Sequence, residues 1–471
     1  MNDSRFRKVR EKLQQLGQEH VLRFWDQLSE TQRAELAEQL EKLEPELLRH
    51  LQQLLREHLS GKRPRGDLEP VEMVRVPTTD EDRARHRRAQ EAGEEALRRG
   101  KVAALLVAGG QATRLGYPGP KGTFPIGPVT ERSLYQYQAE KIRALGRRYG
   151  VTPPWAIMTS PATDEATRRF FEEHDFFGLD PNRVFFFVQH TVPALDPEGK
   201  LLLAEKHRIA ESPNGHGGVF EAIAESGVLD QLAELGVEVL FHFQVDNPLI
   251  KICDPVFVGY HVLENAEMSA KVLKKRDPYE KLGVVGKLNG KYAVIEYSDL
   301  TTEEMEARTE SGELKYWAGS IAIHCYNVHF VRRVLATDEG LPYHVAHKKV
   351  PHVDAQGQPV TPEEPNAYKF ERFVFDALQF AERAVFQEVL REEEFSPVKN
   401  ATGADSPDTA RRDLTRVFAE WLEAAGVEVP RGDDGAPLYP LEISPAFAEG
   451  PDELRQKLPA GFKITGPTVL E

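Results

Sequence analysis

Cysteine is scarce in this sequence: Cys253 and Cys325 are the only two among 471 residues. Two thiols are too few for a disulfide framework or a thiolate metal centre, and they suit a reducing compartment. No apolar run approaches the roughly 18 residues needed to cross a membrane. The opening segment MNDSRFRKVREKLQQLGQEH also lacks the apolar core of a secretory signal. We therefore expect a soluble, cytoplasmic protein.

Positive charge is also in deficit. The chain has 60 Lys and Arg residues against 75 Asp and Glu residues, which gives a formal net charge of −15. Such a charge disfavours non-specific binding to nucleic acid, so we expect neither nucleic acid nor membrane as a partner. An anionic substrate would need a local group of cations. The sequence makes no prediction of the oligomeric state.

The most informative segment is VAALLVAGGQATRLGYPGPKG, residues 102–122. Its apolar run ends at Gly109 and Gly110, which predicts a buried parallel strand whose carboxyl end lies close to a ligand. Arg114 and Lys121 add two cations beside exposed backbone N–H groups, a combination that suits phosphate. The spacing matches neither the Walker A loop nor the dinucleotide fingerprint. A purely structural tight turn is the alternative.

A carboxylate follows another apolar run. Asp246 comes directly after residues 237–245 and is expected at the same sheet edge as the glycine loop. Carboxylate oxygen suits Mg²⁺ that is already bound to phosphates. An Asx turn before Pro248 is the alternative interpretation.

Three weaker signals lie elsewhere in the chain. A second glycine loop, residues 214–218, precedes a predicted helix and contains His216, which is also compatible with a capping role. Glu296 closes a predicted strand and could accept hydrogen bonds from sugar hydroxyls. Lys399 follows a Pro turn and could reach a phosphate, although an isolated Lys is usually solvated.

Short apolar runs alternate with helical patterns after residue 101, which predicts an α/β layered fold. The predicted strands are 155–158, 184–188, 237–245, 270–273, 292–297 and 320–324. The predicted helices are 80–99, 134–149, 165–174, 219–235, 370–380 and 409–424. Residues 1–60 have the spacing of a small helical element, and the basic segment 62–65 is interpreted as a solvated linker.

Taken in order, the motifs resemble those of eukaryotic-type UDP-sugar pyrophosphorylases, and in particular the UDP-N-acetylhexosamine (UDP-N-acetylglucosamine) pyrophosphorylase family. The matching stretches are LLVAGGQATRLGYPGPKG, WAIMTSPATDEATRRFFEEHDFFGL, VDNPLIKICDP, LGVVGKLNGKYAVIEYSDL, HVAHKKVPHVD, ERFVFDALQFAE and VLREEEFSPVKNA. The resemblance covers nearly the whole chain.

The resemblance implies a GT-A-like, Rossmann-related nucleotidyltransferase core. We expect a helical N-terminal region at residues 1–98, a catalytic domain at 99–395 and a small mixed C-terminal lobe at 396–471. It also implies that UTP and a sugar 1-phosphate give a UDP-sugar and pyrophosphate with Mg²⁺ as cofactor. N-acetylglucosamine 1-phosphate is the expected sugar, and a UDP-glucose, UDP-galactose or broad-range UDP-sugar pyrophosphorylase is the alternative.

The resemblance also implies roles for individual residues. Nucleotide-binding positions are Ala108, Gly109, Gly110, Gln189 and Gly215. Phosphate-neutralising catalytic positions are Arg114, Lys121 and Lys399, and Asp246 is the magnesium position. Sugar-binding positions are His216, Gly283, Glu296, Tyr297, Ser320, Phe373 and Phe375.

Two residues depart from the family pattern: His216 and Ser320 stand where the N-acetylhexosamine enzymes have Asn. Both departures concern the sugar and leave the class of reaction unchanged. Two other function classes remain as alternatives. A dinucleotide-dependent oxidoreductase is disfavoured by the glycine spacing, and a non-catalytic nucleotide-binding regulator is disfavoured by the intact set of charged residues.

Overall fold

The computed structural model describes residues 3–61, 66–337 and 340–471. Two compact units are present, each with a hydrophobic core of its own. Unit 1 comprises Met1–Gly66, Gln189–Gly218 and Glu339–Asp376, and unit 2 comprises Asp67–Val188, Val219–Asp338 and Ala377–Glu471. The predicted basic linker, residues 62–65, lies outside the described residues.

Unit 2 is built on a ten-stranded mixed sheet whose main path is β1-β11-β13-β9-β2-β3-β4. Strands β2, β3, β4 and β9 are parallel, whereas β13 runs antiparallel to both β9 and β10. The strands are β1 (Leu68–Glu69), β2 (Val102–Val107), β3 (Trp155–Thr159), β4 (Val184–Val188), β9 (Val239–Gln244), β10 (Met268–Lys274), β11 (Val284–Leu288), β12 (Lys291–Ile295), β13 (Ala318–Asn327) and β18 (Ala384–Glu388).

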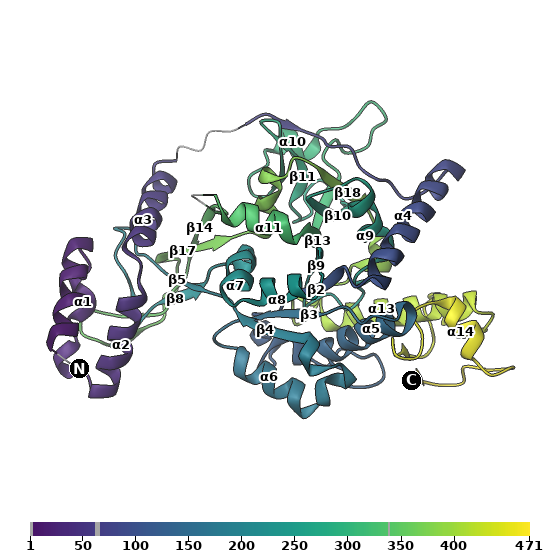
Figure 1. The fold of residues 1–471 in the computed structure, drawn as a ribbon, viewed down its shortest axis with the longest axis horizontal. Helices are drawn as coiled ribbons and strands as arrows, with labels where there is room; N and C mark the ends of the chain where they lie inside the picture. Colours follow the sequence, from purple (N-terminus) through teal and green to yellow (C-terminus); the bar gives the residue numbers. More distant parts are fainter. Residues whose placement is uncertain (1–2, 62–65, 338–339) are drawn as a thin grey trace. The chain divides into compact units, whose positions relative to one another are not determined.

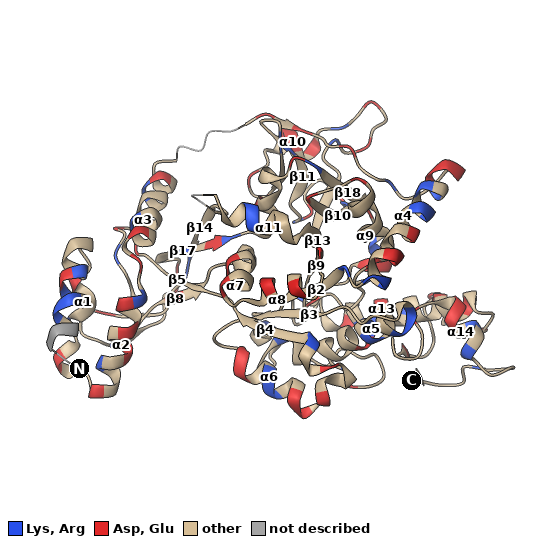
Figure 2. Cartoon of the chain, in the orientation of Figure 1, with Lys and Arg blue, Asp and Glu red and all other residues tan. Residues whose placement is uncertain are grey.

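Helices cover the sheet of unit 2, and Figure 1 shows α5 and α6 lying against its parallel strands. Acidic and basic blocks follow one another along α4, and near its end Arg98 pairs with Glu94 (Figure 2). The α-helices are α4 (Asp80–Arg98), α5 (Leu134–Tyr149), α6 (Asp164–Glu173), α7 (Val219–Glu225), α8 (Val228–Glu234), α9 (Pro255–Leu263), α10 (Thr302–Glu306), α11 (Val328–Leu335) and α12 (Arg391–Glu394). The 3-10 helices are η3 (Thr113–Leu115), η4 (Lys121–Thr123), η5 (Asp175–Gly178) and η6 (Pro181–Arg183), while η8 (Val374–Phe380) spans the boundary between the units.

The core of unit 2 fixes the position of these parallel strands. Trp155 of β3, Phe241 and Phe243 of β9 and Phe171 of α6 are fully buried in one cluster. Burial of each such side chain stabilises the fold by about 1.5–3 kcal/mol. The carboxyl ends of β2 and β9 are therefore held rigidly side by side.

The C-terminal residues of unit 2 pack on a second cluster. Phe418 and Leu422 of α13 lie in it together with Leu134 and Tyr137 of α5. Its elements are α13 (Pro407–Ala424), β19 (Leu441–Ile443), α14 (Pro451–Lys457) and β20 (Thr468–Leu470), with β19 parallel to β20. The C-terminal segment is thus an integral part of unit 2.

Unit 1 combines three N-terminal helices with short strands from two later parts of the chain. Leu13, Leu36 and Leu51 of its helices share one core with Leu195 and Phe370. Its helices are α1 (Asp3–Leu16), η1 (Glu19–Leu22), η2 (Trp25–Gln27), α2 (Glu30–Lys42), α3 (Pro45–Leu59) and η7 (His216–Gly218). Its strands are β5 (Thr191–Pro193), β6 (Leu203–Glu205), β7 (Arg208–Ile209), β8 (Glu211–Pro213), β14 (Tyr343–Lys348), β15 (His352–Val353), β16 (Pro359–Val360) and β17 (Ala367–Arg372).

Most predicted elements are confirmed, and two predicted helices differ from the structure. The predicted helix 219–235 is two helices, because Gly227 adopts φ +77° between α7 and α8. The predicted helix 370–380 is wrong: residues 367–372 form β17, which pairs with β14, and a 3-10 helix follows. An aromatic-rich run is compatible with a helix or a strand, and pairing with β14 stabilises the strand.

The two units cut the chain differently from the predicted domain boundaries. Helix α4, expected in the N-terminal region, belongs to unit 2 because it packs on α9. Residues 189–218 and 339–376 join the N-terminal helices because they complete that hydrophobic core. The functional division into three domains stays a prediction. Among the described residues, no helix is both long enough and apolar enough to cross a membrane.

Candidate functional site

The glycine loop leaves β2 at the carboxyl edge of the parallel strands, as predicted. The backbone N–H of Ala108 donates to the carbonyl of Met158 on β3 over 2.8 Å, which continues the strand by one residue. Ser160 Oγ donates to the carbonyl of Gly109 over 2.8 Å. A side chain at Gly110 would meet no other atom within 4 Å, so the backbone there faces open space.

The Pro-Lys-Gly turn returns to this loop. The backbone N–H of Lys121 donates to the carbonyl of Gly110 over 3.0 Å. A Cβ atom at Gly122 would lie 2.1 Å from the ring of Tyr135, so only glycine allows α5 to approach so closely. The backbone of Lys121 is thereby held beside Gly110.

Asp246 lies where the sequence predicts, at the edge to which the glycine loop belongs. Val107 of β2 is in register with Gln244 of β9, so Asp246 and Gly109 each lie two residues beyond this pair. Lys121 Nζ lies 3.2 Å from Asp246 Oδ2, and both side chains are largely buried. Among the described residues, no group of three or more His, Cys, Asp or Glu side chains could hold a metal. Asp246 thus offers a single protein carboxylate, with one oxygen already contacted by Lys121.

The segment that carries Lys399 is bound to the same turn. Val398 N–H donates to the carbonyl of Asp246 over 2.8 Å, and Asn247 Nδ2 donates to the carbonyl of Glu394 over 2.6 Å. Asn247 Oδ1 also accepts from Ser396 N–H over 3.1 Å. These three hydrogen bonds hold Lys399 next to Asp246.

One pocket of unit 2 brings three of the predicted residues together: Asp246, Lys399 and Ser320 all line it. Ser320 Oγ is buried and has no hydrogen-bond partner within the described part of the chain. An orphaned hydroxyl of this kind costs about 1–3 kcal/mol unless something satisfies it. The pocket therefore has an anionic, a cationic and a neutral polar group ready for a ligand.

A bulge in β13 shapes the wall of this pocket. The register with β10 shifts between Ala270 and Val272, which pair with His324 and Ser320. Ala322 has φ +55°, a left-handed conformation that costs a residue with a side chain about 1–3 kcal/mol. The bulge turns Ile321, Ala322 and Ile323 into the pocket lining.

Gly283 lies next to Ser320, and Glu296 lies close to Gly283 just beyond the end of β12. Ser320 N–H donates to the carbonyl of Gly283 over 2.8 Å. A Cβ atom at Gly283 would lie 3.2 Å from Glu296 Oε1, so the carboxylate is close to this backbone. Tyr297 is exposed to 37 %. Glu296 can accept hydrogen bonds from hydroxyl groups at this position.

Apart from Arg114, the remaining predicted residues belong to unit 1. Gln189 Nε2 donates to the carbonyl of Gly215 over 2.6 Å. Gly215 has φ +84°, and a Cβ atom there would lie 2.3 Å from the carbonyl oxygen of Arg372, so glycine is required. The amide of Gln189 is thus oriented by the second glycine loop.

His216 lies in an aromatic group with Phe373 and Phe375. Its ring centroid is 5.4 Å from that of Phe373 and 5.7 Å from that of Phe375. Burial, with a smaller contribution from His344, lowers the pKa of His216 to about 4. Val374 N–H donates to Nδ1 over 3.2 Å, so the neutral ring carries its proton on Nε2. His216 therefore presents a hydrogen-bond donor.

The predicted residues thus form two groups, one in each unit, with one exception. Arg114 is exposed on η3, and within the described ranges it forms no ion pair with the other predicted residues. Sequence reasoning missed Asn247, although it follows Asp246 directly.

It also missed Lys271, whose fully buried ammonium lies 2.6 Å from Asp254 and 2.6 Å from Glu394. The carbonyl of the same Glu394 accepts the hydrogen bond from Asn247 Nδ2. The available signal was a Lys inside the apolar run MSAKVL, because a buried charge requires a partner.

Comparison with known proteins gives full-length similarities. A family model described as UTP--glucose-1-phosphate uridylyltransferase matches residues 49–404. The chain is 41% identical over 493 residues to UDP-N-acetylhexosamine pyrophosphorylase-like protein 1 of Xenopus tropicalis, covering 98% of this chain and 96% of the relative. It is 37% identical over 433 residues to the UDP-N-acetylglucosamine pyrophosphorylase of Saccharomyces cerevisiae, covering 88% and 91%.

A solved structure gives the same picture. The uridine diphosphate N-acetylglucosamine pyrophosphorylase from Trypanosoma brucei superposes with a TM-score of 0.81 at 29% sequence identity, covering 97% of this chain and 95% of that one. The predicted fold class, an α/β core of this type, is confirmed by this similarity.

Proposed function

Because this chain belongs to the UTP--glucose-1-phosphate uridylyltransferase family, we propose that it transfers the uridylyl group of UTP to N-acetylglucosamine 1-phosphate. The products are UDP-N-acetylglucosamine and pyrophosphate. The observation that carries the proposal is the similarity over nearly the whole length to pyrophosphorylases that form UDP-N-acetylglucosamine. The reaction class, a UTP:sugar-1-phosphate uridylyltransferase, follows from the family itself.

The chemistry needs no general base. A phosphate oxygen of the sugar 1-phosphate, already an anion, attacks the α-phosphorus of UTP, and the bond to the bridging oxygen of pyrophosphate breaks. Charge neutralisation and alignment supply the rate enhancement. The backbone of Ala108–Gly110 approaches the nucleotide, while Arg114, Lys121 and Lys399 neutralise the phosphates. The support for these roles is the fixed position of Lys121 and Lys399 beside Asp246.

Asp246 is the residue that would hold Mg²⁺. Magnesium is commonly bound by one or two carboxylates together with substrate phosphates and water. A single carboxylate at the phosphate-binding edge fits that donor set, and so does the absence of a larger ligand cluster within the described ranges. When bound, the ion neutralises negative charge on the phosphates. Lys121, which contacts Asp246 at 3.2 Å, supplies a second positive charge at the same place.

Base and sugar recognition involve other groups. Gln189 and Gly215 read uracil, because a side-chain amide can both donate and accept in one plane. The proposed sugar-binding residues are Gly283, Glu296, Tyr297 and Ser320 in unit 2 and three residues in unit 1. Those three are His216, Phe373 and Phe375. The support for this assignment is the buried hydroxyl of Ser320 and the Nε2–H donor of His216.

The test is kcat/KM with UTP and each of three sugar 1-phosphates: N-acetylglucosamine, glucose and galactose. We expect N-acetylglucosamine 1-phosphate to be the best substrate. If kcat/KM for glucose 1-phosphate is more than about tenfold higher than for N-acetylglucosamine 1-phosphate, the preferred substrate is the unmodified hexose. This ratio corresponds to about 1.4 kcal/mol of transition-state preference. The absence of pyrophosphate release with every sugar would remove the proposal altogether.

A further inference from the structure

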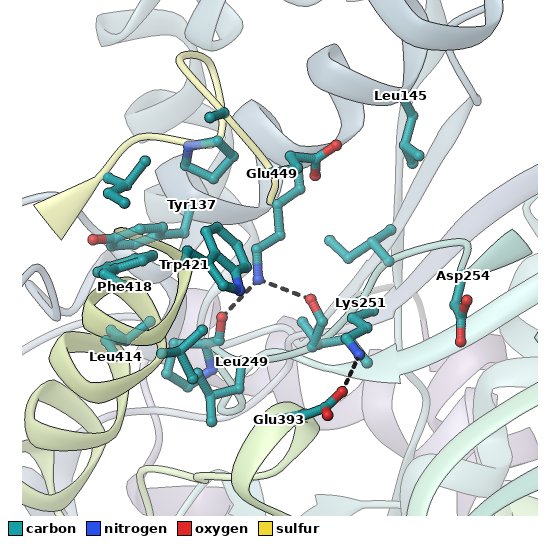
Figure 3. Close-up of a pocket in the computed structure, with 18 of the residues that line it drawn as sticks. Tyr137, Leu145, Leu249, Lys251, Asp254, Glu393, Leu414, Phe418, Trp421 and Glu449 are labelled. Carbon is teal, nitrogen blue, oxygen red and sulfur yellow. Dashed lines mark hydrogen bonds and ion pairs between the residues drawn. The ribbon is translucent and has the colours of Figure 1, made fainter. Parts of the chain in front are cut away.

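Unit 2 contains a second cavity, of about 170 Å³, which we name the C-terminal cavity. It lies between α5, the segment 248–255 that follows β9, and the C-terminal elements α13 and β19 (Figure 3). Asp246, Lys399 and Ser320 are absent from its lining. Ile250 lines both this cavity and the pocket that holds Asp246.

The walls of the C-terminal cavity are largely apolar and aromatic. Leu414, Phe418 and Trp421 line it from α13, with Leu249 and Tyr137 also in the lining (Figure 3). A dry cavity of about 150 Å³ holds a molecule of the size of benzene. The C-terminal cavity therefore has room for a single aromatic ring with a short substituent.

Lys141 brings a cation to this apolar space. Its Nζ donates to the carbonyls of Pro248 and Ile250 over 2.7 and 2.8 Å, and an ammonium has three N–H groups, so one remains. No carboxylate of the described residues forms an ion pair with it. Burial lowers the pKa of Lys141 to about 8.

The other cations that line the cavity are already neutralised. Lys251 Nζ lies 2.7 Å from Glu393 Oε2, as the dashed line in Figure 3 shows. The charge of Arg148 is neutralised by Glu453, whose carboxylate lies 2.5 Å away; Glu449 lies farther from it, at 3.7 Å. Lys141 is thus the cation of the lining whose hydrogen-bond partners are both neutral carbonyls, and the two carboxyl groups that act on its charge, Glu449 and Glu394, form no ion pair with it.

Glu449 lines the cavity and forms no ion pair with Lys141. Burial raises the pKa of Glu449 to about 7, so near neutral pH a large share of its carboxyl groups carries a proton. A protonated carboxyl group donates a hydrogen bond to an anion instead of repelling it.

From these contacts we infer that the C-terminal cavity is a binding site for a small aromatic carboxylic acid. Its ring lies among Leu249, Phe418 and Trp421, and its carboxylate pairs with Lys141. A neutral or cationic aromatic of the same size leaves the charge of Lys141 unmatched. The inference does not depend on the proposed transfer reaction, because it concerns residues outside that machinery.

The test is a binding titration of the full-length protein with three probes of matched size: phenylacetate, phenylacetamide and 2-phenylethylamine. Heat of binding and tryptophan fluorescence are measured together. We expect saturable binding of phenylacetate, at least tenfold tighter than that of phenylacetamide or the amine. The variant Trp421→Phe should lose the fluorescence change while it keeps the heat.

Two variants locate the charge. Lys141→Met should bind phenylacetate at least tenfold more weakly and phenylacetamide as before, which shows that the cavity itself is intact. The matched control Lys101→Met, whose ammonium pairs with Glu238 elsewhere in unit 2, should bind all three probes like the native protein. Equal affinity for phenylacetate and phenylacetamide, tighter binding of the amine, or no saturable binding would overturn the inference even if Lys141→Met failed to fold.

Discussion

Lys121 Nζ lies 3.2 Å from Asp246 Oδ2, and the two residues follow neighbouring parallel strands, β2 and β9. A cation and an anion are therefore held together at the edge of the sheet where the glycine loop ends. An ion pair of this kind keeps both side chains in place in the structure. Substitutions of Lys121 and Asp246 therefore test the proposed reaction most directly.

Replacement of Lys121 by Ala should lower kcat by roughly two to four orders of magnitude, as loss of a preorganised charge donor does. The fold should survive, since the side chain extends from a short 3-10 helix. Steady-state rates of pyrophosphate release and a thermal melt check both points. Lys101→Ala, which removes a Lys paired with Glu238, is the control. Near-native turnover of a folded Lys121→Ala sample would remove this residue from the mechanism.

Asp246→Asn should raise the Mg²⁺ concentration needed for half-maximal activity and lower the maximal rate, because the carboxylate charge is lost. The native enzyme should lose activity in EDTA and regain it with added Mg²⁺. Asp230→Asn, at an exposed residue that pairs with Arg332, should leave the Mg²⁺ dependence unchanged. Full activity in excess EDTA contradicts the metal assignment.

Gln189→Ala should reduce the preference of the enzyme for UTP over other nucleoside triphosphates. The native enzyme is expected to prefer UTP strongly over CTP and ATP, since the amide held by Gly215 matches the edge of uracil. Ratios of kcat/KM for the three nucleotides measure the effect. Equal use of all three by the native protein would show that uracil is not read at all.

Ser320→Ala separates binding from stability. Removal of a buried hydroxyl that has no partner in the described chain should leave the free energy of unfolding equal or higher, within about 1 kcal/mol. Loss of a hydrogen bond to the sugar should at the same time lower kcat/KM by about tenfold. Denaturant unfolding and sugar 1-phosphate kinetics give the two numbers. An unchanged kcat/KM would place Ser320 outside sugar recognition.

His216 should contribute to acid sensitivity of the fold. Burial lowers its pKa to about 4, whereas an unfolded His titrates near 6.5. Below pH 6.5 His216 binds a proton in the unfolded chain but stays neutral in the folded chain. The free energy of unfolding therefore falls as the pH falls from 6.5 to 4. The contribution is complete above pH 6.5 and amounts to at most about 3 kcal/mol. His216→Asn should flatten this part of the stability profile, and an identical slope in native and variant protein would refute the burial argument.

The sequence by itself determined the local parts of the structure and the chemistry that they carry. A short apolar run that ends in Gly109 and Gly110 can be little else than a buried strand followed by a tight turn, and the structure confirms β2 there. The helix predicted at 134–149 coincides with α5, since its start is capped by Ser133 and its end by Gly150. The order of the motifs indicated the family, because many matches in one order cover nearly the whole chain.

Only the tertiary structure decided what depends on contacts between distant residues. The aromatic run from Phe370 has no period that separates helix from strand, and pairing with β14 fixed it as β17. The bulge at Ala322, the buried Lys271 between Asp254 and Glu394, and the unmatched charge of Lys141 each depend on neighbours far away in sequence. Periodicity and spacing report only on neighbours along the chain, whereas burial and charge pairing are set by whatever the fold brings alongside.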